Sequence, residues 1–119
     1  MAHSEAEFHR VTKRLREATG YLELGMTQHA LDCLQGLGAT GTFYAAAELL
    51  RGEALRRQRR FDDAAVHLEE AARHTPEPHD LPAWYALSQC LREAGDRETA
   101  DTILARVRGA KPDAFPPAA

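Results

Sequence analysis

Small and apolar positions recur at fixed spacing along this chain. A small residue is followed three positions later by a larger apolar residue, nine positions after that by alanine, and four positions further by leucine. The unit occurs three times, as Ala18, Tyr21, Ala30 and Leu34, as Gly52, Leu55, Ala64 and Leu68, and as Ser88, Leu91, Ala100 and Leu104. Its copies are displaced by 34 and then 36 residues. This regular displacement predicts an internal repeat.

Each unit contains two amphipathic runs, which is the pattern of a helical hairpin. Small residues at the first and third slots allow two helix backbones to approach closely. Gly25 and Gly95 follow two of the runs and predict helix ends, whereas Asp62, Asp80 and Asp96 lie near helix starts, where carboxylates suit unpaired N–H groups. The predicted helices cover residues 4–24, 27–37, 42–58, 61–74, 81–94 and 97–109.

Length and composition support an all-α chain. At 119 residues, of which 44% are hydrophobic and 28% charged, the chain is the size of one domain, which excludes a multidomain enzyme. Alanine, leucine, arginine and glutamate dominate over the β-branched and aromatic residues that favour strands.

The repeat resembles the tetratricopeptide repeat, whose pattern is W-x2-L-G-x2-Y…A-x3-F…P. The third unit follows it most closely, with Trp84, Leu87, Ser88, Leu91, Ala100, Leu104 and Pro112 in register. The second unit has Glu48 and Arg51 where tryptophan and leucine are usual, and the first lacks both the tryptophan and the proline.

The resemblance implies an all-α, right-handed α-α superhelix, a solenoid of three helix-turn-helix pairs. It places repeats at about 11–44, 45–78 and 81–114 within a domain of residues 1–110. A flexible proline-rich segment is expected at 111–119.

The resemblance also implies a protein-protein interaction module, an adaptor or small chaperone that binds a partner peptide in a concave groove. The first helix of each pair would line this groove with the residues Leu15, Thr19, Leu22, Leu49, Glu53, Arg56, Tyr85, Gln89 and Arg92, beside Thr12 and Ala46. Leucines and Tyr85 would anchor an apolar segment, and Arg56 and Arg92 would bind carboxylates. The alternative is that some of these leucines pack against neighbouring helices.

One family activity is argued against. Members that grip the acidic tail of chaperones use lysine and asparagine clamp residues. The matching places here hold Leu15, Thr19, Leu50, Pro82 and Ala86.

Charge argues against nucleic acid and membrane partners. The formal net charge is −3, whereas both partners require a positive face. A cluster of arginines at 51, 56, 57, 59 and 60 is mixed with Glu53, Asp62 and Asp63, which is typical of a solvated helix end. No stretch approaches the roughly 18 apolar residues of a spanning helix.

No catalytic or cofactor motif is present. His67 and His74 share a helix face but lie two turns apart, about 10 Å along the axis, which is too far to share a metal ion unaided. Cys33 and Cys90 fall within helical runs and form no CxxC pair. We therefore expect no cofactor, no metal and no enzyme, and a cytoplasmic, bacterial-type protein with reduced thiols.

Two other functions stay open. In length and repeat number the chain is similar to the three-repeat chaperones of bacterial type III secretion. It also fits a self-assembling repeat protein, a homo-oligomer that stacks through its terminal repeats. In the last unit Asp101, Thr102 and Arg108 predict a solvated end, with Ile103 and Val107 either covered by Phe115 or free to self-associate.

Overall fold

The computed structural model describes residues 4–38 and 41–110, which form six α-helices and no strand. The helices are α1 (Glu5–Glu23), α2 (Thr27–Leu34), α3 (Thr42–Arg57), α4 (Phe61–Arg73), α5 (Leu81–Glu93) and α6 (Arg97–Ala110). The predicted flexible segment 111–119 lies outside the described residues, and the exact repeat boundaries stay a prediction.

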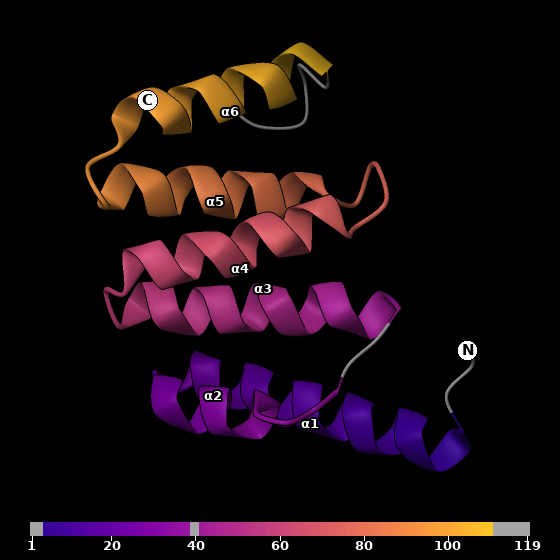
Figure 1. The fold of residues 1–119 in the computed structure, drawn as a ribbon. Coiled ribbons are helices and arrows are strands. Elements are labelled where there is room, and N and C mark those ends of the chain that lie inside the picture. The colour runs from indigo at the N-terminus through magenta and orange to yellow at the C-terminus, as the bar shows by residue number, and fades with distance from the viewer. Residues whose placement is uncertain (1–3, 39–40, 111–119) are drawn as a thin grey trace.

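The helices form three antiparallel pairs stacked in one direction (Figure 1). The stack measures 44 × 29 × 20 Å, and its radius of gyration is 14.8 Å, compared with about 13.5 Å expected for a globule of this length. Among the described residues α1 contacts α3 and α3 contacts α5, whereas α2, α4 and α6 do not contact one another. The first helices of the pairs therefore form one continuous layer, as expected for a helical repeat.

The turn inside each pair is the same structure three times. Gly25, Arg59 and Gly95 all have positive φ, of 74°, 63° and 97°. In each turn the next residue donates its N–H to a carbonyl five residues back, a Schellman closure, in the pairs Met26 to Tyr21, Arg60 to Leu55 and Asp96 to Leu91. The acceptors are the larger apolar residues of the sequence unit, so the repeat in the sequence is also a repeat in backbone hydrogen bonds.

The small residues of the unit lie where the two helices of a pair cross. Ala30, Ala64 and Ala100 are fully buried. A Cβ atom built on Gly52 would lie 2.5 Å from Leu68 Cδ2, and the Ser88 hydroxyl donates to the Ala100 carbonyl at 3.3 Å. The prediction that small side chains permit close crossing is confirmed.

The core is divided along the stack. One cluster joins α1, α2 and α3 around Val11, Leu22 and Leu34, and a second joins α3, α4 and α5 around Leu68, Leu87 and Cys90. Each pair of helices therefore buries its apolar face against the next pair, as a solenoid requires.

Helix α2 is shorter than predicted. It ends at Leu34, and Gln35 is extended with ψ 131°. Gly36 and Gly38 follow with φ of 65°, a conformation that ends a helix. Leu37, 2% exposed, packs into the core between them.

Carboxylate caps were expected at three helix starts. The Asp96 carboxylate accepts the Thr99 N–H at 3.2 Å. Asp80 makes no side-chain cap, and instead its Oδ2 accepts the Trp84 indole N–H at 3.1 Å. Asp80 is therefore the N-cap residue of α5, near a helix start as predicted, but its carboxylate binds an indole N–H in place of a backbone N–H.

Candidate partner-binding surface

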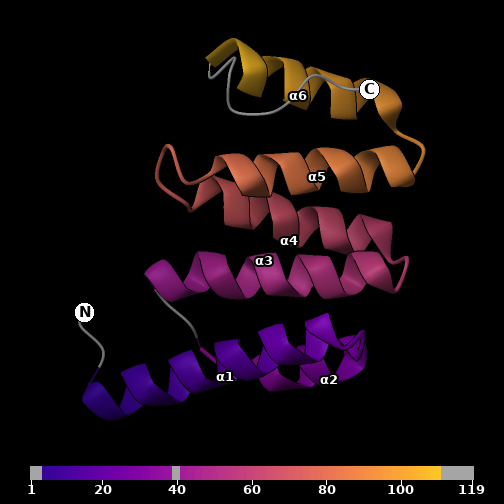
Figure 2. The ribbon, with the colours of Figure 1, turned by 180° about the vertical axis from the view of Figure 1, so that it is seen from behind.

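Helices α1, α3 and α5, labelled in Figure 2, carry all nine predicted site residues. Leu15, Thr19 and Leu22 come from α1, Leu49, Glu53 and Arg56 from α3, and Tyr85, Gln89 and Arg92 from α5. Since these helices contact in the order α1, α3, α5, the three sets lie on one layer of the stack.

On α1 one predicted residue belongs to the interior. Leu22 is only 5% exposed and lies in the core cluster with Ala30 and Leu34. Leu15 is half-buried against the same cluster, and Thr19 is exposed, with its hydroxyl bonded to the Leu15 carbonyl at 2.9 Å. Leu22 is thus corrected to a core residue, because its side of α1 packs on α2.

An apolar hollow of about 660 Å³ lies between α3 and α5. Ala45, Ala46 and Leu49 line it from α3, and Pro82 and Ala83 from α5. The rest of its wall comes from the end of α4 and nearby loops, through Gly41, Ala71, His74, Thr75, Pro76 and His79. A hollow of this volume has ample room for a large apolar side chain, and its α3 and α5 walls are apolar.

Of the nine predicted residues, only Leu49 lines this hollow. Ala46 was expected in the wider groove, but Ala45 and Ala83 were not expected there. The sequence signal for the hollow was the alanine and proline content at the starts of α3 and α5. These small side chains leave space between the two helices, but they form no recognised motif.

The charged end of the predicted groove is already neutralised. Arg56 donates to Glu93 at 2.8 Å and to Glu53 at 3.1 Å, and its hydrogen bond to the Glu53 carboxylate is the main cause of its raised pKa. Arg92 donates to Asp101 of α6 at 2.7 Å. Both arginines therefore bind carboxylates of this chain, so carboxylates of a partner would have to compete with them.

Tyr85 and Gln89 lie one turn apart on α5. The Gln89 amide donates to the Tyr85 hydroxyl at 2.7 Å. Tyr85 is half-buried and Gln89 exposed, so this pair offers polar contacts beside the hollow.

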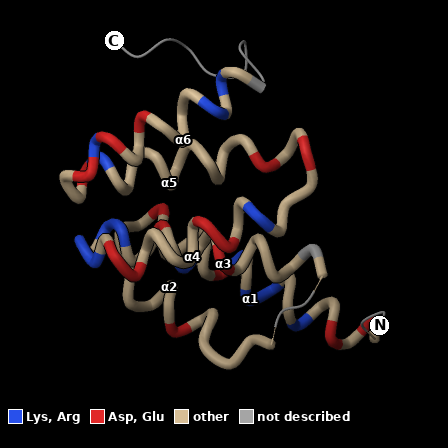
Figure 3. Tube along the Cα trace, turned by 45° about the horizontal axis from the view of Figure 1, so that its top comes forward, with Lys and Arg blue, Asp and Glu red and all other residues tan. Residues whose placement is uncertain are grey.

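Basic residues gather around the α3–α4 turn (Figure 3), and two arginines of the cluster, Arg51 and Arg57, donate to other helices. Arg51 donates to the Leu34 carbonyl at the end of α2 at 2.7 Å, and Arg57 donates to the Leu22 carbonyl near the end of α1. Arg60 pairs with Asp63 at 3.0 Å, and Arg59 lies over the Phe61 ring. The expectation of a solvated helix end was wrong for Arg51, whose guanidinium joins α3 to α2.

Glu48 and Arg51 occupy the places of Trp84 and Leu87 in the third unit. Glu48 is 6% exposed and binds Arg51 at 2.7 Å and the His67 imidazole of α4. Where the third repeat packs an indole, the second repeat buries a carboxylate that pairs with Arg51 on the same helix and contacts His67 on α4.

The other candidate chemical groups have structural roles. The His74 Nδ1–H donates to the Glu70 carbonyl at 2.9 Å, and the described residues contain no group of three side chains suited to a metal ion. Cys33 and Cys90 are buried free thiols, and burial raises the Cys90 pKa. A thiol of raised pKa is a poor nucleophile.

No helix in the described part of the chain combines the length and apolarity needed to cross a bilayer.

Stacked antiparallel pairs, identical turns and a divided core define a helical-repeat protein. A sequence model of the tetratricopeptide repeat matches residues 55–119, more than half of the chain. The chain therefore belongs to the tetratricopeptide repeat family, a family of non-catalytic protein-interaction repeats. No curated protein and no solved structure gave a significant match.

Proposed function

We propose that this protein is an adaptor or small chaperone that binds a segment of a partner polypeptide on the α1–α3–α5 layer, with one apolar side chain in the α3–α5 hollow. The hollow is the observation that carries the proposal. Leu49 lines it and is only half-buried, so part of its side chain is available to a ligand.

The hollow offers apolar contacts to a bound side chain. Its α3 and α5 walls are alanine, leucine and proline, and burying an apolar side chain there gains about 1.5 to 3 kcal/mol. Arg56 supplies no free charge, because Glu53 and Glu93 already hold it. Leu15, Thr19, Tyr85 and Gln89 would contact the flanking residues of the segment.

A library of displayed random peptides tests the proposal while the natural partner is still unidentified. Selection on the wild-type protein should enrich peptides that carry a large apolar side chain. Leu49→Glu should weaken the binding of these peptides by at least tenfold, because it places a charge in the hollow.

Val66→Glu is the matched control. Val66 is 62% exposed on α4 and lines no part of the hollow, so this variant should keep full affinity. Peptides that bind Leu49→Glu as well as wild type, while its helical circular dichroism is unchanged, would refute the proposed site.

A further inference from the structure

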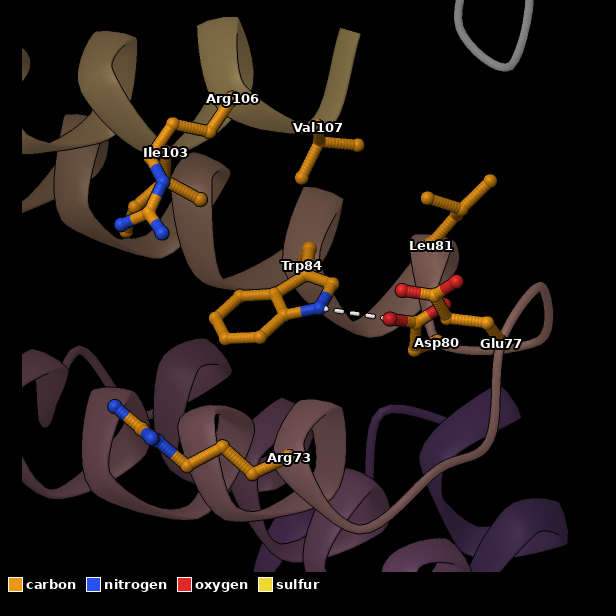
Figure 4. A pocket seen from close by; sticks show the side chains of 8 residues that line it. All are labelled: Arg73, Glu77, Asp80, Leu81, Trp84, Ile103, Arg106 and Val107. Atoms are coloured by element: carbon orange, nitrogen blue, oxygen red, sulfur yellow. Dashed lines mark hydrogen bonds between the residues drawn. The ribbon is translucent and has the colours of Figure 1, made fainter. Parts of the chain in front are cut away.

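A second pocket, of about 370 Å³, lies between α4, α5 and α6. It shares no lining residue with the α3–α5 hollow. Trp84 lies at its centre in Figure 4, with Leu81, Ile103 and Val107 around it. The sequence did not predict this pocket, since it depends on α6 crossing above the start of α5.

Charged groups of opposite sign line the two ends of the pocket. The guanidinium groups of Arg73 and Arg106 lie toward the six-membered ring of Trp84, and the carboxylates of Glu77 and Asp80 lie toward its nitrogen (Figure 4). Asp80 Oδ1 is buried without a hydrogen-bond partner among the described residues. A buried carboxylate oxygen of this kind normally binds a donor.

The described chain ends beside this pocket. Helix α6 runs antiparallel to α5, so its last turn lies at the same end of the stack as the first turn of α5 (Figure 1). Val107 lines the pocket, and the helix ends at Ala110. The next nine residues are Lys-Pro-Asp-Ala-Phe-Pro-Pro-Ala-Ala.

These nine residues match the pocket in reach and in charge. Phe115 follows Ala110 by five residues, which span up to roughly 16 Å, whereas Ile103 lies only about 10 Å back along α6. Lys111 and Asp113 carry the charges that Glu77 and Arg106 attract. Prolines at 112, 116 and 117 reduce the entropy lost on ordering.

We propose that segment 111–119 binds in the pocket between α4, α5 and α6, with the Phe115 ring against Trp84, Leu81 and Val107. Lys111 then lies near Glu77 and Asp80, and Asp113 near Arg106. Because the segment is attached at Ala110, its effective concentration at the pocket is on the order of millimolar, so weak contacts are enough to hold it. The bound segment covers the outer face of the last repeat.

Trp84 reports on this contact directly, because it is the single tryptophan of the chain. In the full-length protein, Phe115→Ala should shift the tryptophan emission to longer wavelength and raise its quenching by acrylamide at least twofold. Val107→Asp should do the same from the pocket side, whereas Pro117→Ala, in the same segment, should leave both signals at wild-type values.

Circular dichroism must show equal helix content in all variants, so that a change in emission reports on the pocket alone. Emission and quenching of Phe115→Ala equal to wild type would overturn the proposal. A wild-type signal that falls to that of Phe115→Ala on dilution would also overturn it, because the occupant would then be a second copy of the chain.

Discussion

Gly52 and Leu68 are in contact so close that no side chain fits between the two helices. A Cβ atom on Gly52 would lie 2.5 Å from Leu68 Cδ2 and 3.2 Å from the Leu68 nitrogen, and Leu68 is fully buried. The first repeat has Ala18 at the place of Gly52, so the closeness is a property of the second pair.

Gly52→Ala should destabilise the protein. Alanine favours the helix by about 1 kcal/mol, but the overlap with Leu68, which is fully buried and would have to shift, costs about 1 to 3 kcal/mol. We expect a net loss of up to about 2 kcal/mol in urea unfolding. Gly20→Ala is the control, since nothing lies within 4 Å of that Cβ, and it should be neutral or stabilising. A stabilised Gly52→Ala variant would contradict the packing described.

Arg59→Gly should be more stable than Arg59→Ala. Both variants lose the guanidinium that lies 5.2 Å from the Phe61 ring centre, but only alanine keeps a Cβ at a φ of 63°. A left-handed conformation costs a residue with a side chain about 1 kcal/mol relative to glycine. Urea unfolding of the two variants measures this difference, and equal midpoints would show that the turn bears no strain.

The Tyr44 hydroxyl should ionise at a higher pH than an ordinary tyrosine. Its hydroxyl donates to Glu70 at 2.6 Å, and this bond, with burial and the charges of Glu48 and Glu70, raises the Tyr44 pKa to about 12. Because the unfolded chain ionises near pH 10, the stability contributed by Tyr44 is complete below pH 10 and is lost as the pH rises toward 12.

Absorbance at 295 nm follows this ionisation. Tyr44→Phe should remove the ionisation step near pH 12, and Glu70→Gln should lower the pKa of that step. Tyr21→Phe is the control and should keep the late step. If the late step disappeared in Tyr21→Phe, the raised pKa would not belong to Tyr44.

Glu48→Ala should cost about 1 to 3 kcal/mol of stability, because it removes a buried carboxylate that pairs with Arg51 and contacts His67. The control is Glu53→Ala on the same helix. This variant removes one carboxylate from Arg56, but Arg56 keeps its ion pair with Glu93. The control should lose about 1 kcal/mol or less. Similar losses in urea unfolding for both variants would show that burial of Glu48 has no special cost.

Helix positions followed from the sequence because their determinants are local. Five of the six helices end within one residue of the predicted C-terminal residue, and glycine or Arg59 closes the turn inside each pair by hydrogen bonds within one chain segment. The predicted α2 was too long because Leu37 continues the apolar pattern after the helix has ended. Leu22 was misplaced for a similar reason, since periodicity identifies an apolar side of a helix but not the neighbour that covers it.

The sequence by itself determined the three hairpins, their order and their close crossings, because helix periodicity, turn closure and small contact residues act over a few positions. Only the tertiary structure decided which groups meet across the stack. Arg56 and Glu93 are 37 residues apart, and Arg51 and the Leu34 carbonyl 17. The α3–α5 hollow and the Trp84 pocket likewise exist only between helices, and their shape depends on the packing distance and rotation of whole helices.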